Sequence, residues 1–145
     1  MNIKNRKAKY NYEILETFVA GIVLQATEIK SIRLGEVDFA DSYCPFIGNE
    51  LFLRNCSISE YKDGTYYNHD PKRDKKLLMN KKELKKLKEK ISQEGLTIVP
   101  LEMFINEKGL CKVKISLARG KKTIDKRNSI KINDLKREFN RKIKV

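Results

Sequence analysis

Apolar and polar side chains alternate along residues 10–24, a stretch rich in β-branched and aromatic residues. A two-residue period of this kind predicts a long β-strand with one face toward a core. Gly21 lies inside the predicted strand, where glycine favours a bulge or a sharp bend that lets one strand serve two parts of a small barrel. One face of the strand would carry Tyr12, Ile14 and Phe18, and the other Leu15 and Val19.

Two segments have helical spacing instead. Residues 27–35 predict a short helix with Thr27 as N-cap and a stop at Gly35, because two isoleucines are three positions apart. A longer helix is predicted from Asn80, which begins an Asn-x-x-Glu capping box, to Gly95. Its apolar stripe should pack on the body of the protein while its lysines stay largely outside. The stripe is Leu84, Leu87 and Ile91, and the lysines are Lys81, Lys82, Lys85, Lys86 and Lys88.

Two further pairs of strands are predicted as hairpins. Gly48-Asn49, a dipeptide favoured in tight turns, separates residues 41–47 from residues 50–54. Residues 97–105 and 110–118 flank a second turn, and alternation in the last strand gives it one buried and one basic face. Pro100 has no N–H to give to a ladder and should lie at an edge or a bulge. Residues 63–76, between the hairpins, lack apolar periodicity and predict a long exposed loop.

The order of these elements predicts a mainly-β protein, an oligonucleotide-binding-like antiparallel β-barrel with short inserted helices. The alternative is a two-layer α+β sandwich. The 145 residues suffice for one domain, with a basic N-terminal arm over residues 1–9, a barrel over residues 10–118 and a basic C-terminal tail over residues 119–145. Alone in water the tail is expected to be disordered, because its few apolar side chains cannot offset about 1–2 kcal/mol per residue of backbone ordering entropy.

Positive charge is concentrated rather than spread along the chain. The sequence has 32 Lys and Arg against 19 Asp and Glu, a formal net charge of +13, and the excess lies in residues 1–9, 71–90 and 119–145. Basic blocks with an acidic remainder are typical of proteins that bind a polyanion such as RNA. The alternative for any single block is a solvated lysine-rich face, which explains three separate blocks less well.

Residue types that carry catalysis are sparse. His69, the only histidine, lies beside Asp70, but no second histidine or nucleophile motif completes a triad. No glycine-rich phosphate motif is present, and the carboxylates of Asp38 and Asp41 are interpreted as solvated rather than as a Mg²⁺ site. We therefore expect a binding protein without enzymatic activity, metal or cofactor. Three cysteines without C-x-x-C spacing, and no apolar run of about 18 residues, indicate a reducing cytoplasm and no membrane span.

Seven short words in the sequence carry a resemblance to a known family. They are NRKAKYNYEI (5–14), AGIVLQATEIKSIRLGE (20–36), DSY (41–43), NHDPKRDKKLLMNKKEL (68–84), EGLTIVPL (94–101), KVKISLARGKK (112–122) and DKR (125–127). With these words, in this order over nearly the whole chain, the sequence resembles the SsrA-binding proteins, also called small protein B. Each word alone is weak, and their common order makes the resemblance specific.

The resemblance implies an RNA-binding protein of trans-translation. Such a protein binds the tRNA-like domain of transfer-messenger RNA (tmRNA, or SsrA) and accompanies it to the A site of a stalled ribosome. The resemblance also implies that the basic tail enters the small-subunit decoding centre and the empty mRNA channel and folds there as a helix. The expected partners are tmRNA and the ribosome, with a monomer bound one-to-one to the RNA. A general RNA-binding barrel acting in translation is the alternative that the charge pattern alone supports equally.

The same words assign candidate contacts. For the RNA-binding surface we expect the basic arm, two tyrosines, two basic residues of the short helix and the L-L-x-N word: Asn5, Arg6, Lys7, Tyr12, Lys30, Arg33, Tyr43, Leu78 and Asn80. Asn80 is equally explained as a helix cap, and the tyrosines as packing in the barrel. For the ribosome-bound tail we expect Gly120 as a flexible exit, followed by Lys121, Lys122, Ile124, Asp125, Lys126, Arg127, Lys136 and Arg137.

Two positions depart from the family pattern. Val19 stands where the family commonly has a glutamate associated with tmRNA binding, so a carboxylate hydrogen bond to RNA is missing here. Ile124 stands where an aromatic residue or histidine commonly precedes the aspartate, so stacking on a decoding-centre base is replaced by apolar contact. Neither departure breaks the family frame.

Overall fold

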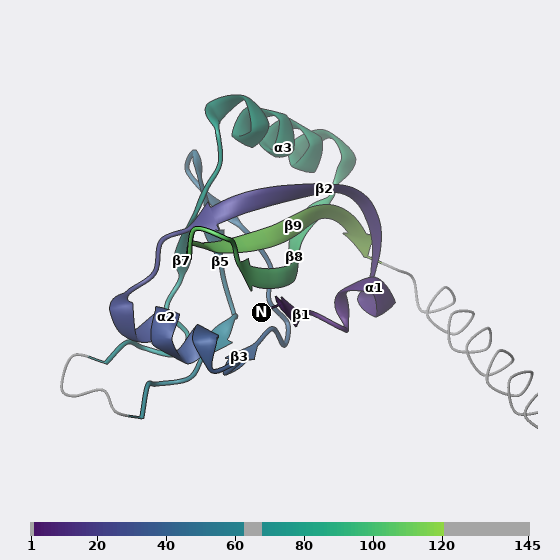
Figure 1. Cartoon of the computed structure of the whole chain (residues 1–145). Helices are drawn as coiled ribbons and strands as arrows, with labels where there is room; N and C mark the ends of the chain where they lie inside the picture. Colours follow the sequence, from purple (N-terminus) through teal and green to yellow (C-terminus); the bar gives the residue numbers. More distant parts are fainter. Residues whose placement is uncertain (1, 63–67, 121–145) are drawn as a thin grey trace, which may run out of the picture.

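The computed structural model describes residues 2–62 and 68–120. Within them, a main sheet has the strand order β1-β8-β9-β2-β7-β5-β4, with every neighbouring pair antiparallel, and β3 pairs with β6 in a small second sheet (Figure 1). The strands are β1 (Asn2–Lys4), β2 (Tyr12–Ile22), β3 (Val37–Asp38), β4 (Phe46–Ile47), β5 (Glu50–Leu53), β6 (Ser57–Ile58), β7 (Lys75–Leu78), β8 (Thr97–Ile105) and β9 (Cys111–Gly120). The helices are α1 (Ala8–Asn11), α2 (Ala26–Arg33) and α3 (Lys81–Glu94). The predicted mainly-β fold with short inserted helices is confirmed.

A short segment before β4 links strands that lie far apart in the strand order. Tyr43 bridges to Arg54 at the end of β5, and the Cys44 N–H donates to the Ile98 carbonyl of β8 over 2.8 Å. Because β5 and β8 lie near opposite edges of the main sheet, this link draws the sheet round toward a barrel. The open, curled sheet is of the oligonucleotide-binding type that the order of elements predicted.

Strand β2 pairs with β9 on one side and with β7 on the other, and its pairing with β9 is irregular at one point. Its bulge lies at Leu15, between the paired positions of Ile14 and Glu16, so of the two alternatives predicted for Gly21 the bulge was wrong. Gly21 is instead the residue at which β2 pairs on both sides, with Lys112 of β9 and Leu78 of β7. A Cβ at Gly21 would lie 3.3 Å from the Leu78 Cβ, so glycine permits the close approach of β7.

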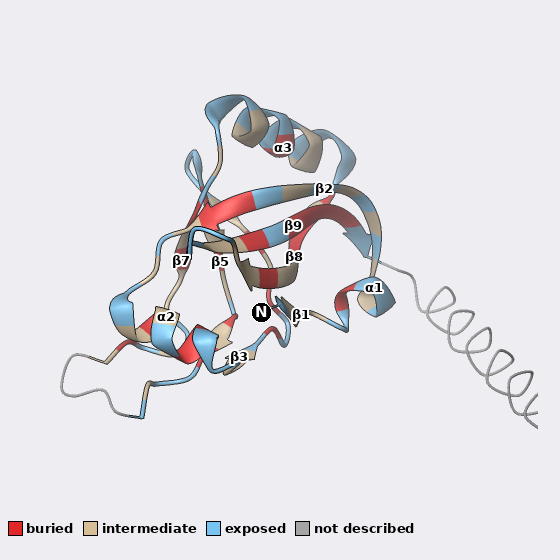
Figure 2. Cartoon of the chain, viewed as in Figure 1, coloured by how far each residue is buried: buried red, intermediate tan, exposed pale blue. Residues whose placement is uncertain are grey.

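The core lies between the inner face of the curled sheet and the helices that cover it. Buried residues gather along β8 and β9 and at the end of β2, while the outer surface of α3 is exposed (Figure 2). Ile32 of α2 and Leu87 of α3 belong to the same buried cluster as the strand residues Leu53, Ile98 and Ile115. Each fully buried side chain of this size contributes about 1.5–3 kcal/mol to folding.

Both predicted helices are present. The N-cap residue was predicted correctly for α3 but not for α2. In α3 the Asn80 side chain accepts from the Glu83 N–H, and Gly95 ends the helix at φ 64°, as predicted. In α2 the N-cap is Gln25 rather than Thr27, because Gln25 forms a reciprocal capping box with Glu28. The Thr27 hydroxyl pairs instead with a ring nitrogen of His69, at 2.8 Å.

The long exposed loop predicted over residues 63–76 was wrong for its second half. Residues 63–67 lie outside the described residues, but His69 is 3% exposed and Lys75, fully buried, begins β7. The His69 Nε2 donates to the Ile58 carbonyl and the Lys75 ammonium to the Cys56 carbonyl, each over 2.8 Å. These polar side chains are buried because they hydrogen-bond to residues far away in the sequence. Such burial produces no apolar periodicity from which a sequence pattern could predict it.

The residues predicted as a basic N-terminal arm lie against the sheet. β1 pairs with β8, and Ala8 of α1 is buried. Asn5 follows β1, donating its backbone N–H to the Leu101 carbonyl and its side-chain amide to the Pro100 carbonyl, both over 2.8 Å. The register of β8 against β9 shifts between Pro100 and Glu102, so Pro100 lies at a bulge as predicted. Residues 2–9 therefore have a fixed place beside the barrel.

Candidate nucleic-acid interface

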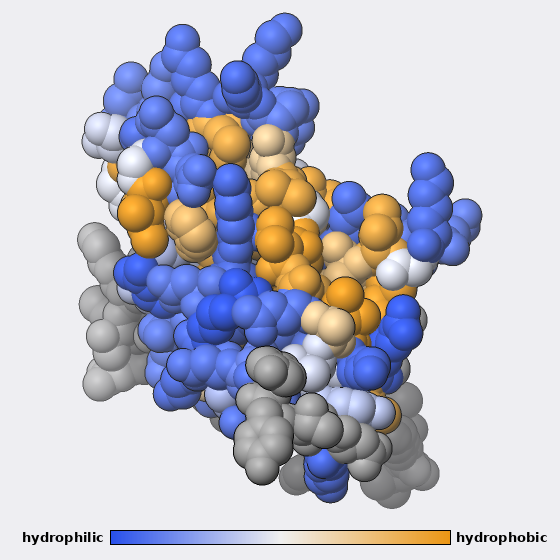
Figure 3. Space-filling view, turned by 90° about the vertical axis from the view of Figure 1, so that its left-hand side faces the viewer, coloured by the Kyte–Doolittle hydropathy of each residue, from blue (hydrophilic) through white to orange (hydrophobic). Residues whose placement is uncertain are grey.

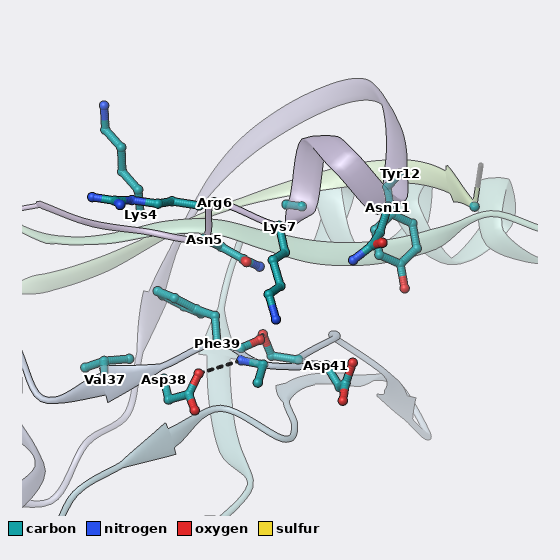
Figure 4. A pocket seen from close by; sticks show the side chains of 14 residues that line it. Lys4, Asn5, Arg6, Lys7, Asn11, Tyr12, Val37, Asp38, Phe39 and Asp41 are labelled. Carbon is teal, nitrogen blue, oxygen red and sulfur yellow. Dashed lines mark hydrogen bonds between the residues drawn. The ribbon is translucent and has the colours of Figure 1, made fainter. Parts of the chain in front are cut away.

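A surface hollow of about 600 Å³ lies beside α1 and collects predicted RNA-binding residues from distant parts of the chain. Its walls come from residues 4–8, 11–12 and 37–42 and from Gly120, where β9 ends (Figure 4). Four of its lining residues were predicted as RNA contacts, and a fifth as the start of the tail: Asn5, Arg6, Lys7 and Tyr12, with Gly120. We call this site the α1 hollow.

Anchored and free groups share the α1 hollow. The Asn5 side-chain amide donates a hydrogen bond to the backbone of β8, so Asn5 positions the residues that follow it. Arg6 and Lys7 are exposed, and neither has an ion-pair partner within residues 2–62 and 68–120. Lys7 and Tyr12 reach toward the 37–42 wall, whereas Arg6 extends sideways beside Lys4 (Figure 4). The hollow therefore has one cation directed inward and one along its side, a suitable arrangement for contacts to a phosphate chain.

The opposite wall of the α1 hollow is acidic. Asp38 accepts the Ala40 N–H over 2.9 Å, and Asp41 is held at φ 56°, a left-handed conformation that non-glycine residues seldom adopt. Both carboxylates line the hollow opposite Lys7. Carboxylates accept hydrogen bonds from base amino groups, so this wall can face bases while the basic rim faces phosphates. The sequence indicated solvated carboxylates at these two positions and gave no sign that they face the basic arm.

A second surface lies on the outer face of the sheet around Gly21. Val19 is 54% exposed and Leu78 is 51% exposed, and the β9 residues paired opposite Val19 and Gly21 are Lys114 and Lys112. Figure 3 shows an apolar patch on this side of the molecule between hydrophilic regions. We call it the Val19 face. Asn80 follows β7 here, but its side chain is engaged as the α3 cap, accepting from the Glu83 N–H and donating to the Glu83 carboxylate.

The remaining predicted contacts lie elsewhere. Lys30 and Arg33 are exposed on α2, where the Lys30 ammonium lies 5.3 Å from the Tyr61 ring centroid. Tyr43 is half-buried and does not line the α1 hollow. The tail candidates from Lys121 to Arg137 lie outside the described residues. The predicted RNA contacts are thus spread over the α1 hollow, the Val19 face and α2, apart from Tyr43, which lines a hollow beside α3.

Part of the mid-chain basic block is paired with other groups of the same chain, some buried and some exposed. Arg73 pairs with the buried carboxylate of Glu28, and Lys76 pairs with Glu50 at 3.2 Å. Burial lowers the pKa of Lys75, whose ammonium is bonded to a backbone carbonyl. The positive charge that this block presents to a partner therefore lies mainly on α3.

The thiols are unsuited to nucleophilic chemistry. Burial raises the pKa of Cys56 to about 12 and that of Cys111 to about 11, and it raises the pKa of Cys44 still further. A thiol is nucleophilic only as thiolate, so these side chains remain unreactive at neutral pH. They fill space as small apolar groups.

Comparison with known proteins decides the family. The model of the SmpB protein family matches residues 2–145. The chain belongs to the SmpB family. The SsrA-binding protein of Phocaeicola vulgatus is 53% identical over 99% of this chain and 96% of its own length. That of Thermus thermophilus is 49% identical over 93% of this chain and 94% of its own. The resemblance carried by the seven sequence words is confirmed.

A solved structure supports the same assignment for the fold of this SmpB-family chain. It is described as "tmRNA-SmpB: a journey to the center of the bacterial ribosome", with 51% sequence identity and a TM-score of 0.71. The match covers 84% of this chain and 85% of that chain. In the part of the chain that the structure describes, no helix is long and apolar enough to cross a membrane.

Proposed function

We propose that this SmpB-family protein binds transfer-messenger RNA and delivers it to the A site of stalled ribosomes in trans-translation. The family match over residues 2–145, with relatives named SsrA-binding protein at about 50% identity, carries the proposal. The protein acts by binding and catalyses no reaction. Its place of action is the cytoplasm, where ribosomes stall. A general RNA-binding barrel would show the same charge pattern but would not carry this family's words in order.

The α1 hollow and the Val19 face are the proposed RNA surfaces. The first offers cations beside Tyr12 that make no ion pair within the described residues, and the second offers apolar groups beside Lys112 and Lys114. Phosphate contacts from the cations would supply most of the affinity, and contacts to unstacked bases would fix the register. Lys30 and Arg33 on α2 are proposed as further phosphate contacts.

The tail is proposed to act on the ribosome rather than on tmRNA. β9 ends at Gly120 on the edge of the α1 hollow, so the tail begins beside the proposed RNA surface. Its cations Lys121, Lys122, Lys126, Arg127, Lys136 and Arg137 would pair with rRNA phosphates, with Ile124 and Asp125 at the decoding centre. Removing residues 123–145 should leave RNA binding intact and abolish tagging on stalled ribosomes. An equal loss of both would contradict this division of labour.

Two measurements test the tmRNA assignment. RNA that co-purifies with the protein should be identified by sequencing as tmRNA. Lys7→Ala should lower the slope of log affinity against log salt by about 0.9, because one phosphate contact is lost. Lys9→Ala is the matched control, since Lys9 is exposed in the same segment but does not line the α1 hollow. Equal slopes for the two variants would mean that the hollow does not contact phosphate.

Val19→Glu tests the Val19 face. Since Val19 is half exposed, a carboxylate there stays hydrated and the melting temperature should not change. Affinity for tmRNA should rise by about 1 kcal/mol if the RNA offers the donor that relatives use, or stay unaltered if the contact has become apolar. Thr17→Glu, which adds the same charge at an exposed position two residues earlier in β2, is the control. Strong weakening by Val19→Glu alone would mean that RNA contacts Val19 but offers no donor to a carboxylate, and equal effects of the two variants would remove Val19 from the proposed surface.

A further inference from the structure

Two adjoining hollows form a groove along α3, on neither proposed RNA surface. One of about 820 Å³ is lined by α3 and by Phe46 and Asn49. The other, of about 410 Å³, is lined by α3 and by residues 43–46 and 96–98. They share Phe46, Lys88 and Ser92, so they are continuous, and we call them together the α3 groove. No residue that lines the α1 hollow lines this groove.

The floor of the α3 groove is apolar. Phe46, Leu84 and Ile91 are half-buried and pack against the core with one side while lining the groove. Lys88 crosses the groove, donating to the Gly48 carbonyl and to the Asn49 side chain, each over 2.9 Å. That pair of bonds holds the β4–β5 turn beside α3 and fixes the width of the groove.

The lysines of α3 differ in whether their charge is neutralised. Lys86 and Lys90 both pair with Glu16 of β2, at 2.8 and 3.1 Å. Lys81 and Lys85 line the groove, are exposed, and make no ion pair or side-chain hydrogen bond within the described ranges. Glu89 is the acidic side chain among the lining residues of the larger hollow. The groove therefore combines an apolar, partly aromatic floor with unneutralised cations on its rim.

We propose that the α3 groove binds a single-stranded RNA segment, with a base against Phe46 and Leu84 and its phosphates on Lys81 and Lys85. Proteins bind single-stranded nucleic acid by combining aromatic and apolar groups with nearby cations. The aromatic and apolar groups stack against the unpaired bases, and the cations neutralise the phosphates. The proposal goes beyond the proposed function, since it adds a second RNA-binding site and does not depend on tmRNA being the first ligand. One small protein would then hold two RNA segments on different sides of its barrel.

Crosslinking and salt titration of the full chain test the α3 groove. The probe is an oligouridylate of about 12 nucleotides carrying 5-bromouridine. Ultraviolet crosslinks should map to the peptide that contains Phe46. Lys85→Gln should lower the salt slope of affinity by about 0.7, the value for one phosphate contact on a single strand. Lys82→Gln is the matched control, because Lys82 is an exposed lysine of the same helix that does not line the groove.

Phe46→Leu separates stacking from folding. Leucine keeps apolar packing against the core but removes the aromatic ring, so affinity for the oligouridylate should fall by about fivefold or more while the melting temperature changes little. Equal salt slopes for Lys85→Gln and Lys82→Gln, crosslinks confined to other peptides, or binding of oligoglutamate but not of oligouridylate would each overturn the proposal. Lys7→Ala should leave the Phe46 crosslink in place, so failure at the α1 hollow and failure at the α3 groove are distinguishable.

Discussion

Helices α2 and α3 both present basic residues to solvent, yet they dock on the barrel by opposite means. α3 docks through an apolar stripe centred on Leu87, which is fully buried. α2 buries Ile32 but also the carboxylate of Glu28, which is 0% exposed, and the hydroxyl of Ser31. The two helices therefore look alike on their exposed surfaces but are held on the barrel by different contacts, apolar for α3 and largely ionic for α2.

The buried ion pair that holds α2 on the barrel, between Glu28 and Arg73, joins three segments. One Glu28 oxygen accepts the Gln25 N–H over 2.8 Å and pairs with Arg73, which also donates to the Val23 carbonyl over 3.2 Å. Glu28 thus holds the helix cap, the exit of β2 and the segment before β7 together. By contrast, the charges of α3 that meet the barrel pair with Glu16 at the surface.

Among substitutions that remove one of these contacts, Glu28→Ala should lower the stability of the fold the most. Removing one partner of a buried pair leaves the other uncompensated, so the free energy of unfolding should fall by about 4 kcal/mol. Denaturant unfolding measures the loss. Glu50→Ala, which removes the exposed partner of Lys76, should cost less than about 1 kcal/mol. Similar small losses in both variants would mean that α2 does not depend on its buried charge.

Leu87→Ala should have the next largest effect. A buried leucine cut to alanine loses transfer free energy and leaves a cavity, which together cost about 3 kcal/mol. Leu78→Ala, at a half-exposed position on the Val19 face, is the control and should cost little. If Leu87→Ala is as mild as the control, the apolar stripe is not what docks α3.

The same contrast explains which parts of the structure the sequence could predict. α3, β2 and both hairpins follow from apolar period and turn residues, which are local signals. The docking of α2 and the start of β7 depend on Glu28, Arg73 and Lys75, which look like solvent residues until their distant partners are known. The α1 hollow was partly predicted, since residues 5–14 and 41–43 carried family words, while nothing in the sequence indicated that these two segments face each other.

His69→Leu probes the hydrogen bonds that join α2 and β6 through the His69 ring. The change leaves the Thr27 hydroxyl and the Ile58 carbonyl without their ring partner, at a cost of about 2 kcal/mol. Thr27→Val should cost less, and the double variant should lose less than the sum of the two, because both remove one shared hydrogen bond. Additive losses, measured by denaturant unfolding, would show that the two side chains act independently.

Glu16→Gln should have the smallest effect, because both of its pairs are at the surface. The hydrogen bonds from Lys86, and then from Lys90, hold the pKa of Glu16 below its ordinary value of 4.5. A carboxyl whose pKa is lowered in the folded state stabilises the fold above its unfolded pKa, and that contribution is lost as pH falls through the folded pKa. At neutral pH the wild type should therefore exceed Glu16→Gln by less than about 1 kcal/mol, and the difference should shrink in concentrated salt. Well below pH 4.5 the two proteins should unfold alike. A difference that survives both acid and salt would mean that Glu16 supports α3 through packing rather than charge, and the contrast between the helices would then lie only in α2.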